Sequence, residues 1–253
     1  GSVKVSLHGG CGIGTRPVEL HIWAMQQLGA IVEVADGYIK ARCRNGLIGN
    51  KIVFPFISVG ATENAMMAAS LAKGRTRIIN AAREPEIIDL GNCLNSMGAK
   101  ISGHGTDNII IDGVETLSSA EHCVIADRIE AGTFAIAAVI TQGDLTLSNM
   151  NPVYLNALFA VLEQTGSAVE IGENWARVSS SSRAKPVDIA TQPYPGFPTD
   201  LQAQYMSLMA TADGSSKISE TIFENRFMHV PELMRMSGDI QIDGRSCIVH
   251  GKA

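Results

Sequence analysis

The sequence predicts an α/β protein that repeats one structural unit about every 70 residues. A helix end followed by a strand occurs four times, with Gly29, Gly98, Gly166 and Ser237 at intervals of 69, 68 and 71 residues. Each of these strands is followed by a turn and a second strand, which is typical of a hairpin. A helix rich in small residues, then a turn and a strand, recurs three times with the same period. A fixed period of this length indicates units that bury their apolar faces against neighbouring copies.

The first copy is expected to hold one strand, one helix and a hairpin. Residues 3–7 alternate between apolar and polar side chains, which predicts a strand. Apolar residues at positions i, i+4 and i+7 from Val18 predict a helix over residues 17–28, and Gly29 is suited to end it. The hairpin strands are expected at 31–34 and 38–41.

The later copies add a strand and a helix ahead of these elements, so that the full unit is strand, helix, strand, helix and two strands. The chain begins partway through a unit, either because the first copy has diverged or because these residues belong to a longer protein; we expect the second. The helix–turn–strand segments are predicted at 61–80, 132–149 and 201–220, the second helices at 86–97, 152–165 and 231–236, and the hairpin strands at 99–101, 108–111, 168–171, 175–178, 240–242 and 247–249.

The composition argues against several classes of protein. The net charge is −5 and neither half of the chain carries a basic stripe, which disfavours binding to nucleic acid or an anionic membrane. We expect neither a secretion leader nor a membrane span, because the most apolar stretch, residues 132–140, is far too short to cross a bilayer. The cysteines are odd in number and none has CxxC spacing, which indicates a reducing cytoplasm rather than disulfides or zinc. These cysteines are Cys11, Cys43, Cys93, Cys123 and Cys247.

The glycine-rich segment 9–14 surrounds Cys11 and is followed by Arg16 and Pro17. A junction of strand, glycine loop and helix directs backbone N–H groups toward an anion, and Arg16 would favour the thiolate form of the cysteine. We therefore expect Cys11 to be the reactive centre of an enzyme that handles a phosphorylated substrate. The alternatives are a tight turn with an incidental cysteine, or a dinucleotide fingerprint ending at Glu33, although the glycine spacing does not fit the latter.

Three helix starts occupy equivalent positions in the repeat, near Ser58, Thr133 and Asp200. Helix N-termini on one face would suit phosphates, and Asp200 is a candidate base toward a substrate hydroxyl. Capping is the structural alternative for Asp200 and the default explanation for Thr133. Arg226 is flanked by aromatic residues, and Arg83 is its counterpart in an earlier copy; salt-bridged packing between repeats is the alternative for both.

Histidine spacing predicts no metal site, because no pair of histidines has the HxxxH pattern, and we expect no cofactor. The histidines are His8, His21, His104, His122, His229 and His250.

Five motifs in order give the chain a resemblance, essentially from end to end, to the UDP-N-acetylglucosamine 1-carboxyvinyltransferase family of peptidoglycan synthesis. The sibling shikimate-pathway enolpyruvyl transferases share the repeat but lack the cysteine loop. The motifs are GGCGIGTRPVELH at 9–21, SVGATEN at 58–64, AAREPEI at 81–87, FPTD at 197–200 and FENRF at 223–227.

The resemblance implies a fold of two domains, each an inside-out α/β barrel closed from three copies of the unit, with the active site in the cleft between them. It places the boundary near residues 121–126, so that 1–125 would be part of the cysteine-loop domain and 126–253 part of the second barrel domain.

The resemblance also implies a reaction, transfer of the enolpyruvyl group of phosphoenolpyruvate to the sugar 3′-hydroxyl of UDP-N-acetylglucosamine with release of phosphate. Cys11 would protonate the enol carbon and could form a covalent adduct, which makes it the expected target of fosfomycin, and Asp200 would take the hydroxyl proton. Arg226, Asp127 and Arg128 would lie near the cleft. The residues that would line the nucleotide-sugar site are Arg16, Pro17, Val18, Glu19, Leu20, Ser58, Val59, Gly60, Ile222 and Phe223.

Some family features differ or are missing. His8 stands where the family usually has proline, and Phe56 lies near a place where some members carry a lysine. The lysine–asparagine pair and the C-terminal arginines that hold phosphoenolpyruvate have no counterpart, so we expect this chain to be inactive on its own. The alternatives are a non-catalytic, truncated homologue that binds a nucleotide sugar and, less favoured, a shikimate-type transferase. A role in cell-wall biogenesis, cell shape and cell division, and a monomer or weak oligomer, are the remaining expectations.

Overall fold

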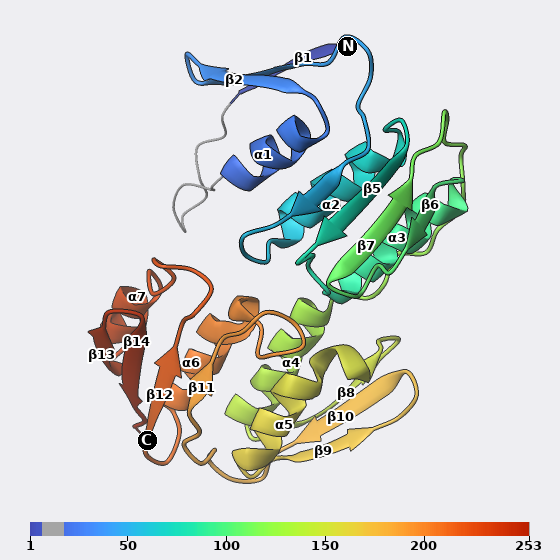
Figure 1. Cartoon of the computed structure of the whole chain (residues 1–253). Helices are drawn as coiled ribbons and strands as arrows, with labels where there is room; N and C mark the ends of the chain where they lie inside the picture. The colour runs from blue at the N-terminus through green and yellow to red at the C-terminus, as the bar shows by residue number, and fades with distance from the viewer. Residues whose placement is uncertain (7–17, 253) are drawn as a thin grey trace. The chain divides into compact units, whose positions relative to one another are not determined.

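The computed structural model describes residues 1–6 and 18–252, which fold into two compact units, Gly1–Val124 and Ile125–Ala253 (Figure 1). Among the described residues, none of the helices has the length and apolar character needed to cross a bilayer.

The first unit contains two copies of the repeat. The first copy is a three-stranded antiparallel sheet with the order β1-β3-β2 and one helix, and the second is a four-stranded sheet with the order β4-β5-β7-β6, in which β4 runs parallel to β5. The elements are β1 (Ser2–Ser6), α1 (Glu19–Gln27), β2 (Ile31–Ala35), β3 (Tyr38–Arg42), β4 (Lys51–Val53), α2 (Val59–Ser70), β5 (Arg75–Ile79), α3 (Pro85–Ser96), β6 (Lys100–Ser102) and β7 (Asn108–Asp112).

The second unit contains the other two copies. Their sheets have the orders β8-β10-β9 and β11-β12-β14-β13, and β11 runs parallel to β12. The elements are α4 (Arg128–Ile140), β8 (Asp144–Ser148), the 3-10 turn η1 (Pro152–Leu155), α5 (Asn156–Gln164), β9 (Ala168–Ile171), β10 (Trp175–Ser179), β11 (Ile189–Ala190), the 3-10 turn η2 (Thr199–Leu201), α6 (Gln202–Ala210), β12 (Ser215–Ser219), α7 (Val230–Arg235), β13 (Asp239–Asp243) and β14 (Ser246–His250).

These sheets confirm the predicted repeat. All four place the strand before the second helix next to the last strand of the hairpin, and all four hairpins are antiparallel. The complete unit of strand, helix, strand, helix and two strands is present in the second and fourth copies. The third copy differs, because residues 113–127, all of them described, hold no strand; this stretch instead runs across the boundary between the two units.

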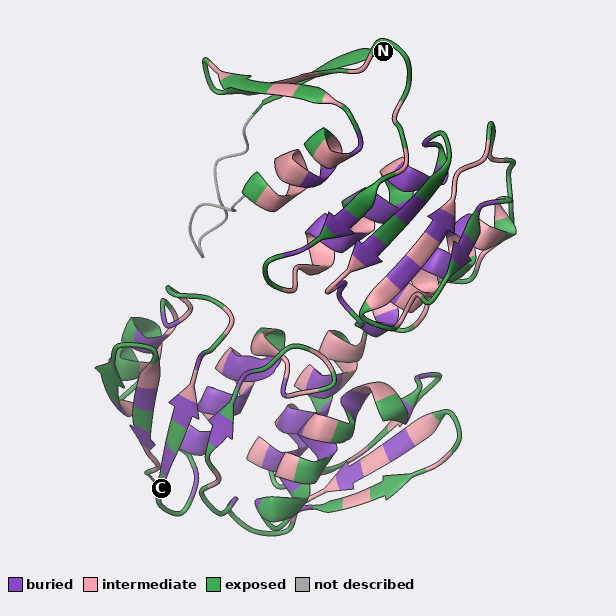
Figure 2. Ribbon diagram, viewed as in Figure 1, coloured by how far each residue is buried: buried purple, intermediate pink, exposed green. Residues whose placement is uncertain are grey.

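Each unit has its own apolar core between helices and sheets. In the first unit, Ile52, Met66, Ile78 and Ile109 are completely buried, and Figure 2 shows the buried residues concentrated on α2, β5 and β7. The helix α2 buries mainly alanines and a methionine, and small side chains allow a helix to lie close against a sheet.

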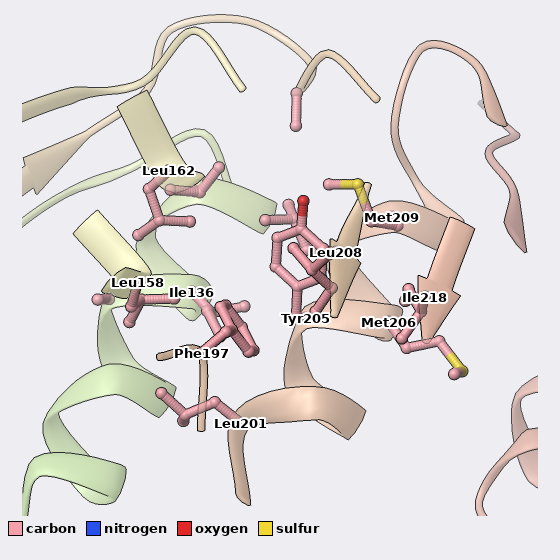
Figure 3. Close-up of a cluster of buried hydrophobic side chains, with 14 of the residues drawn as sticks. Ile136, Leu158, Leu162, Phe197, Leu201, Tyr205, Met206, Leu208, Met209 and Ile218 are labelled. Carbon is pink, nitrogen blue, oxygen red and sulfur yellow. The ribbon is translucent and has the colours of Figure 1, made fainter. Parts of the chain in front are cut away.

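The core of the second unit surrounds Tyr205, which lies among Leu158, Leu162, Leu208 and Phe197 (Figure 3). The Tyr205 ring makes an edge contact with Phe197, with 5.4 Å between ring centres. Because the residues of α6 are fixed in this core, the turn η2 immediately before α6 is held at a defined place.

Candidate active site

The predicted site residues fall into three groups, of which the structure describes two. Cys11, Arg16 and Pro17 lie outside the described residues. The second group is in the first unit, at the starts of α1 and α2, and the third is in the second unit, at η2 and in the loop after β12. Each described group is built within one unit.

The start of α2 is fixed by its own side chains. Ser58 is the N-cap residue, and its hydroxyl accepts a hydrogen bond from Ala61 N at 3.3 Å. Thr62, completely buried, donates to Ser58 O at 2.7 Å and accepts from Ala82 N at 3.1 Å, which joins the helix start to the segment after β5. The N–H groups of the first turn of a helix have no partner within the helix, so this turn can bind an anion or a polar ligand.

The structure brings the start of α1 beside the start of α2. His21, in the first turn of α1, accepts a hydrogen bond at Nδ1 from the side-chain amide of Asn64 in α2. A Cβ atom at Gly60 would lie 3.1 Å from Cε1 of the His21 ring, so the glycine allows this close approach. The predicted site residues Val18, Glu19 and Leu20 are therefore close to Ser58, Val59 and Gly60. Sequence reasoning assigned His21 no role, although His21 lies one helical turn after the predicted residue Val18.

In the second unit, Asp200, Phe223 and Arg226 lie together. Asp200 is in η2, and its carboxylate accepts a charged hydrogen bond from the guanidinium of Arg226. Cζ of Arg226 lies 5.0 Å from the centre of the Phe223 ring, which is the arrangement of a cation–π contact. The Asp200 side chain is 53% exposed and that of Arg226 only 17%. An accessible carboxylate is thus held in a fixed direction by a largely buried cation.

The capping explanations for two predicted residues are wrong. Asp200 is not the N-cap of η2; that residue is Pro198, and the side chain of Asp200 bonds to Arg226 instead. Thr133 lies inside α4, where its hydroxyl donates to Ile129 O at 2.8 Å, as is common for threonine within a helix. Asp127 is the cap of α4 and accepts from Ile129 N at 2.7 Å. The helix α4 begins at Arg128, four residues before the predicted start at residue 132.

Two further candidates, Asp127 and Arg128, are both part of the α4 start. Asp127 makes the capping bonds, and Cζ of Arg128 lies 5.8 Å from the centre of the Tyr194 ring. The ion pair of Arg226 lies within the fourth copy, so the alternative explanation, a salt bridge between repeats, is wrong for this arginine.

Burial shifts the pKa of three groups near these sites. It lowers the pKa of His21, and burial together with the nearby Arg226 lowers the pKa of His229, so both rings are neutral at neutral pH. In α2, burial and then the neighbouring Glu86 and Glu84 raise the pKa of Glu63. The histidine near Arg226 is therefore neutral, and the ion-pair partner of Arg226 is Asp200.

One residue of this site was missed by sequence reasoning. Glu220 follows β12 directly, is 1% exposed, and accepts hydrogen bonds from Thr199, the neighbour of Asp200, and from the backbone of Phe223. The signal was present in the repeat, since the equivalent residues of the second and third copies, Asn80 and Asn149, are both asparagine.

The described groups can bind an anion or polar ligand at the start of α2 and can accept a proton at Asp200. The aromatic face of Phe223 adds an apolar contact surface. Within the described residues, no group of three or more His, Cys, Asp or Glu side chains could hold a metal ion. The expectation of a metal-free site remains a prediction, because Cys11 and His8 are outside the described part of the chain.

Comparison with known proteins places the chain in a family. Residues 1–253 match the family described as EPSP synthase (3-phosphoshikimate 1-carboxyvinyltransferase). The chain is 56% identical over 248 residues to the UDP-N-acetylglucosamine 1-carboxyvinyltransferase of Gluconobacter oxydans and 53% identical over 251 residues to that of Gluconacetobacter diazotrophicus. The matches cover 98% and 99% of this chain, which spans about 60% of the length of these relatives (59% and 60%).

The fold is similar to that of the enolpyruvyl transferase NikO from Streptomyces tendae, with a TM-score of 0.84 at 23% identity, over 99% of this chain and 60% of that one. The predicted fold class and the predicted family resemblance are both confirmed. With its matching repeat, relatives and structural neighbour, the chain belongs to the EPSP synthase family and has the enolpyruvyl transferase fold.

Proposed function

We propose that this chain belongs to a UDP-N-acetylglucosamine 1-carboxyvinyltransferase, in which it supplies the reactive cysteine and much of the nucleotide-sugar site. The observation that carries the proposal is the group formed by Asp200, Arg226 and Phe223, in a chain 50–56% identical to relatives with that name. The reaction would move the enolpyruvyl group of phosphoenolpyruvate to the sugar 3′-hydroxyl and release phosphate.

The proposed roles follow from the chemistry of each group. Asp200 takes the proton of the attacking hydroxyl, and its partial exposure allows substrate to reach it. Arg226 keeps the carboxylate in one orientation, and Phe223 contacts the substrate through its ring. Cys11 donates a proton to C3 of phosphoenolpyruvate, which becomes a methyl group while the sugar oxygen bonds to C2. Phosphate then leaves C2, and the methyl group loses a proton so that the double bond forms again.

The starts of α1 and α2 would bind the nucleotide part of the sugar. The backbone N–H groups of Val59 and Gly60 lie in the first turn of α2, where they have no partner within the helix, and they suit the oxygen atoms of such a ligand. His21 supports this assignment because its ring holds the two helix starts together without adding a positive charge. Glu19 and Leu20 complete this part of the proposed site, together with Arg16, Pro17 and Val18.

The biological setting is part of the same proposal. The enzyme would act in the cytoplasm, in peptidoglycan synthesis, and thereby in cell-wall biogenesis, cell shape and cell division. It would bind phosphoenolpyruvate and UDP-N-acetylglucosamine without nucleic acid, membrane or cofactor, as a monomer or weak oligomer.

An assay of phosphate release by the complete gene product tests the proposal. Phosphoenolpyruvate with UDP-N-acetylglucosamine is expected to give phosphate, whereas phosphoenolpyruvate with shikimate 3-phosphate is not. The reverse preference would identify a shikimate-type transferase. Binding of UDP-N-acetylglucosamine without turnover would identify a nucleotide-sugar-binding module. The 253-residue chain, assayed alongside, is expected to show no turnover.

Labelling with the epoxide fosfomycin, followed by mass spectrometry, tests the cysteine separately. Cys11 is expected to be labelled before the other four cysteines. Cys247 is an internal control, because burial raises the pKa of its thiol to about 11 and leaves little reactive thiolate. Preferential labelling of Cys43, Cys93 or Cys123 would contradict the assignment.

A further inference from the structure

We infer that Glu220 is a positioning residue of the proposed sugar-acceptor site, where its buried carboxylate fixes Asp200 and the loop of Phe223 relative to each other. This inference rests on the proposed function, because it concerns the site that would bind UDP-N-acetylglucosamine. Nothing in the reaction requires Glu220 to touch a substrate, so its role is to hold the residues that do.

The carboxylate of Glu220 is completely satisfied by neutral donors. Its Oε1 atom accepts from the Thr191 hydroxyl at 2.9 Å, from Ile222 N at 2.8 Å and from Phe223 N at 3.0 Å. Its Oε2 atom accepts from the Thr199 hydroxyl at 2.9 Å. Glu220 is 1% exposed, and four hydrogen bonds of normal length offset the cost of burying its carboxylate.

The four donors come from three separate segments. Thr191 follows β11, Thr199 begins η2 next to Asp200, and Ile222 and Phe223 belong to the loop after β12. One carboxylate therefore joins the residue beside the proposed base to the loop that carries the proposed sugar contact. A small movement of any one segment changes the environment of the other two.

A second connection joins the same parts from the exposed side. Arg226 extends from the loop to the carboxylate of Asp200 and contacts the ring of Phe223. Asp200, Arg226, Phe223, Glu220 and Thr199 thus form a closed ring of contacts. Glu220 is the buried side of this ring and Asp200 the exposed side.

The repeat shows that the fold itself does not require this glutamate. Phe54 and Thr191 each follow the short parallel strand of their copy, and each donates its backbone N–H to the carbonyl of the last residue of the neighbouring strand. Thr191 is therefore equivalent to Phe54. The residues that follow the neighbouring strands, Glu220 and Asn80, are equivalent in the same way. In the second copy, Phe54 is buried, and Asn80 Nδ2 donates a hydrogen bond to Phe54 O at 2.9 Å. The fourth copy replaces both partners together with a hydrogen-bonded pair of Thr and Glu.

The paired replacement points to a function at this place rather than to folding. A buried carboxylate is costly without partners, and an asparagine supports the same sheet in the second copy. The added hydrogen bonds reach the only parts of the fourth copy that the proposed function assigns to substrate, η2 and the loop after β12. We therefore attribute Glu220 to the site and not to the sheet.

The test compares kinetic constants of the complete gene product with those of Glu220→Gln. The glutamine keeps the shape but carries one oxygen, so it cannot accept all four bonds, and its NH₂ group faces donors. We expect KM for UDP-N-acetylglucosamine to rise and kcat to fall, each by about tenfold or more, because small displacements of reacting groups have large effects on rate. The KM for phosphoenolpyruvate is expected to change less than about twofold.

Two further variants separate positioning from stability. Thr199→Val removes one bond to Glu220 and should reproduce the change in KM for the sugar nucleotide, whereas Thr199→Ser keeps the hydroxyl and should restore it. Leu162→Ala, in the core of the same unit, lowers stability without touching the ring of contacts. It should lower the melting temperature and leave both KM values unchanged.

The outcomes distinguish the inference from the proposed function. If the wild-type protein turns over its substrates and folded Glu220→Gln keeps both constants for UDP-N-acetylglucosamine within about twofold, the inference is overturned while the function stands. If Glu220→Gln does not fold, an unchanged KM in Thr199→Val overturns it equally. If the wild-type protein binds without turnover, Kd for the sugar nucleotide takes the place of KM. A wild-type protein that neither binds nor reacts overturns the proposed function, and the inference with it.

Discussion

The second copy of the repeat, residues 51–112, and the fourth, residues 189–250, have the same sheet and differ at the ends of their strands. Both have a short parallel edge strand, the same strand order and the same register in the hairpin. In the second copy, the residues after the two parallel strands are Phe54 and Asn80, which are hydrogen-bonded to each other. In the fourth copy, the equivalent hydrogen-bonded residues are Thr191 and Glu220.

The helix starts of these two copies differ in the same way. The second copy begins α2 with the cap Ser58 and then Gly60, whereas the fourth begins η2 with Pro198 and then Asp200. One helix start has a glycine that the His21 ring approaches closely, and the other has a charged side chain held by Arg226. The comparison teaches that the sheets determine the fold and that the proposed chemistry depends on a few substitutions beside them.

The largest effect that tests this comparison is expected from Asp200→Asn. If the fourth copy carries the proton acceptor, kcat of the complete gene product should fall by about 10²–10⁴-fold, the range for loss of a general base. Phosphate release measures it. The matched control is Asp213→Asn, in the same copy, whose exposed carboxylate lies 4.0 Å from Arg183 and has no role in the proposed chemistry. Equal activity of the two variants would contradict the assignment of Asp200.

The next largest effect is expected at Asn80, which follows β5 and is equivalent to Glu220. Asn80→Glu introduces the residue of the fourth copy into the second, which has Phe54 in place of the threonine partner. Asn80 has a φ of 59°, in the region that asparagine tolerates better than glutamate. Lost hydrogen bonding and this conformation should lower the free energy of unfolding by about 2 kcal/mol, as measured by urea denaturation.

A contrary result would weaken the comparison directly. If Asn80→Glu leaves the unfolding free energy unchanged, the two strand ends are interchangeable and the glutamate of the fourth copy needs no special explanation.

A smaller effect is expected at the helix start of the second copy. Ser58→Ala removes the capping bond to Ala61 N and should lower the free energy of unfolding by about 1 kcal/mol. Ser96→Ala is the control, because its hydroxyl donates to Cys93 O near the end of α3 and caps no helix start. Thermal unfolding of both variants measures the difference, and an equal loss in the two would show that capping is not what Ser58 contributes.

The smallest effect is expected from Glu63→Gln. The folded pKa of Glu63 lies above its ordinary value near 4.5, so the native state binds more protons than the unfolded state in this range, and its stability falls as pH rises through the folded pKa. The neutral variant should therefore be more stable at pH 7, by under about 1 kcal/mol because solvent screens a partly exposed side chain, and equal to the wild type near pH 4. Melting curves at the two pH values check it; a gain that is larger at pH 4 would contradict it.

Sequence reasoning predicted the repeat well because the fold depends on periodic features. Turns at Gly74, Gly143 and Gly214 recur with the same spacing in the structure as in the sequence, and each is followed by the expected strand. Capping could not be predicted equally well, because it depends on where a helix begins to within one residue. Thr133 was misplaced for this reason, and Asp127 is the actual cap.

The contacts of the candidate site were harder to predict because they join distant residues. The pair of Asp200 and Arg226 spans 26 residues, and Glu220 reaches 29 residues back to Thr191. No local pattern encodes such contacts. Alignment of the copies would have revealed Glu220 as a departure from asparagine, but only the packed structure shows which donors it meets.

The ring of contacts through Glu220 has a thermodynamic consequence. Because the Phe223 loop and the Asp200 turn share one buried carboxylate, they do not vary independently, and a ligand that orders one part reduces the entropy that remains to be lost by the other. Binding of the sugar nucleotide at the loop and alignment of the proton acceptor then become a single cooperative event. In the second copy, the bond from Asn80 joins two strand ends, and the hydroxyl of Thr62 joins the start of α2 to the segment after β5.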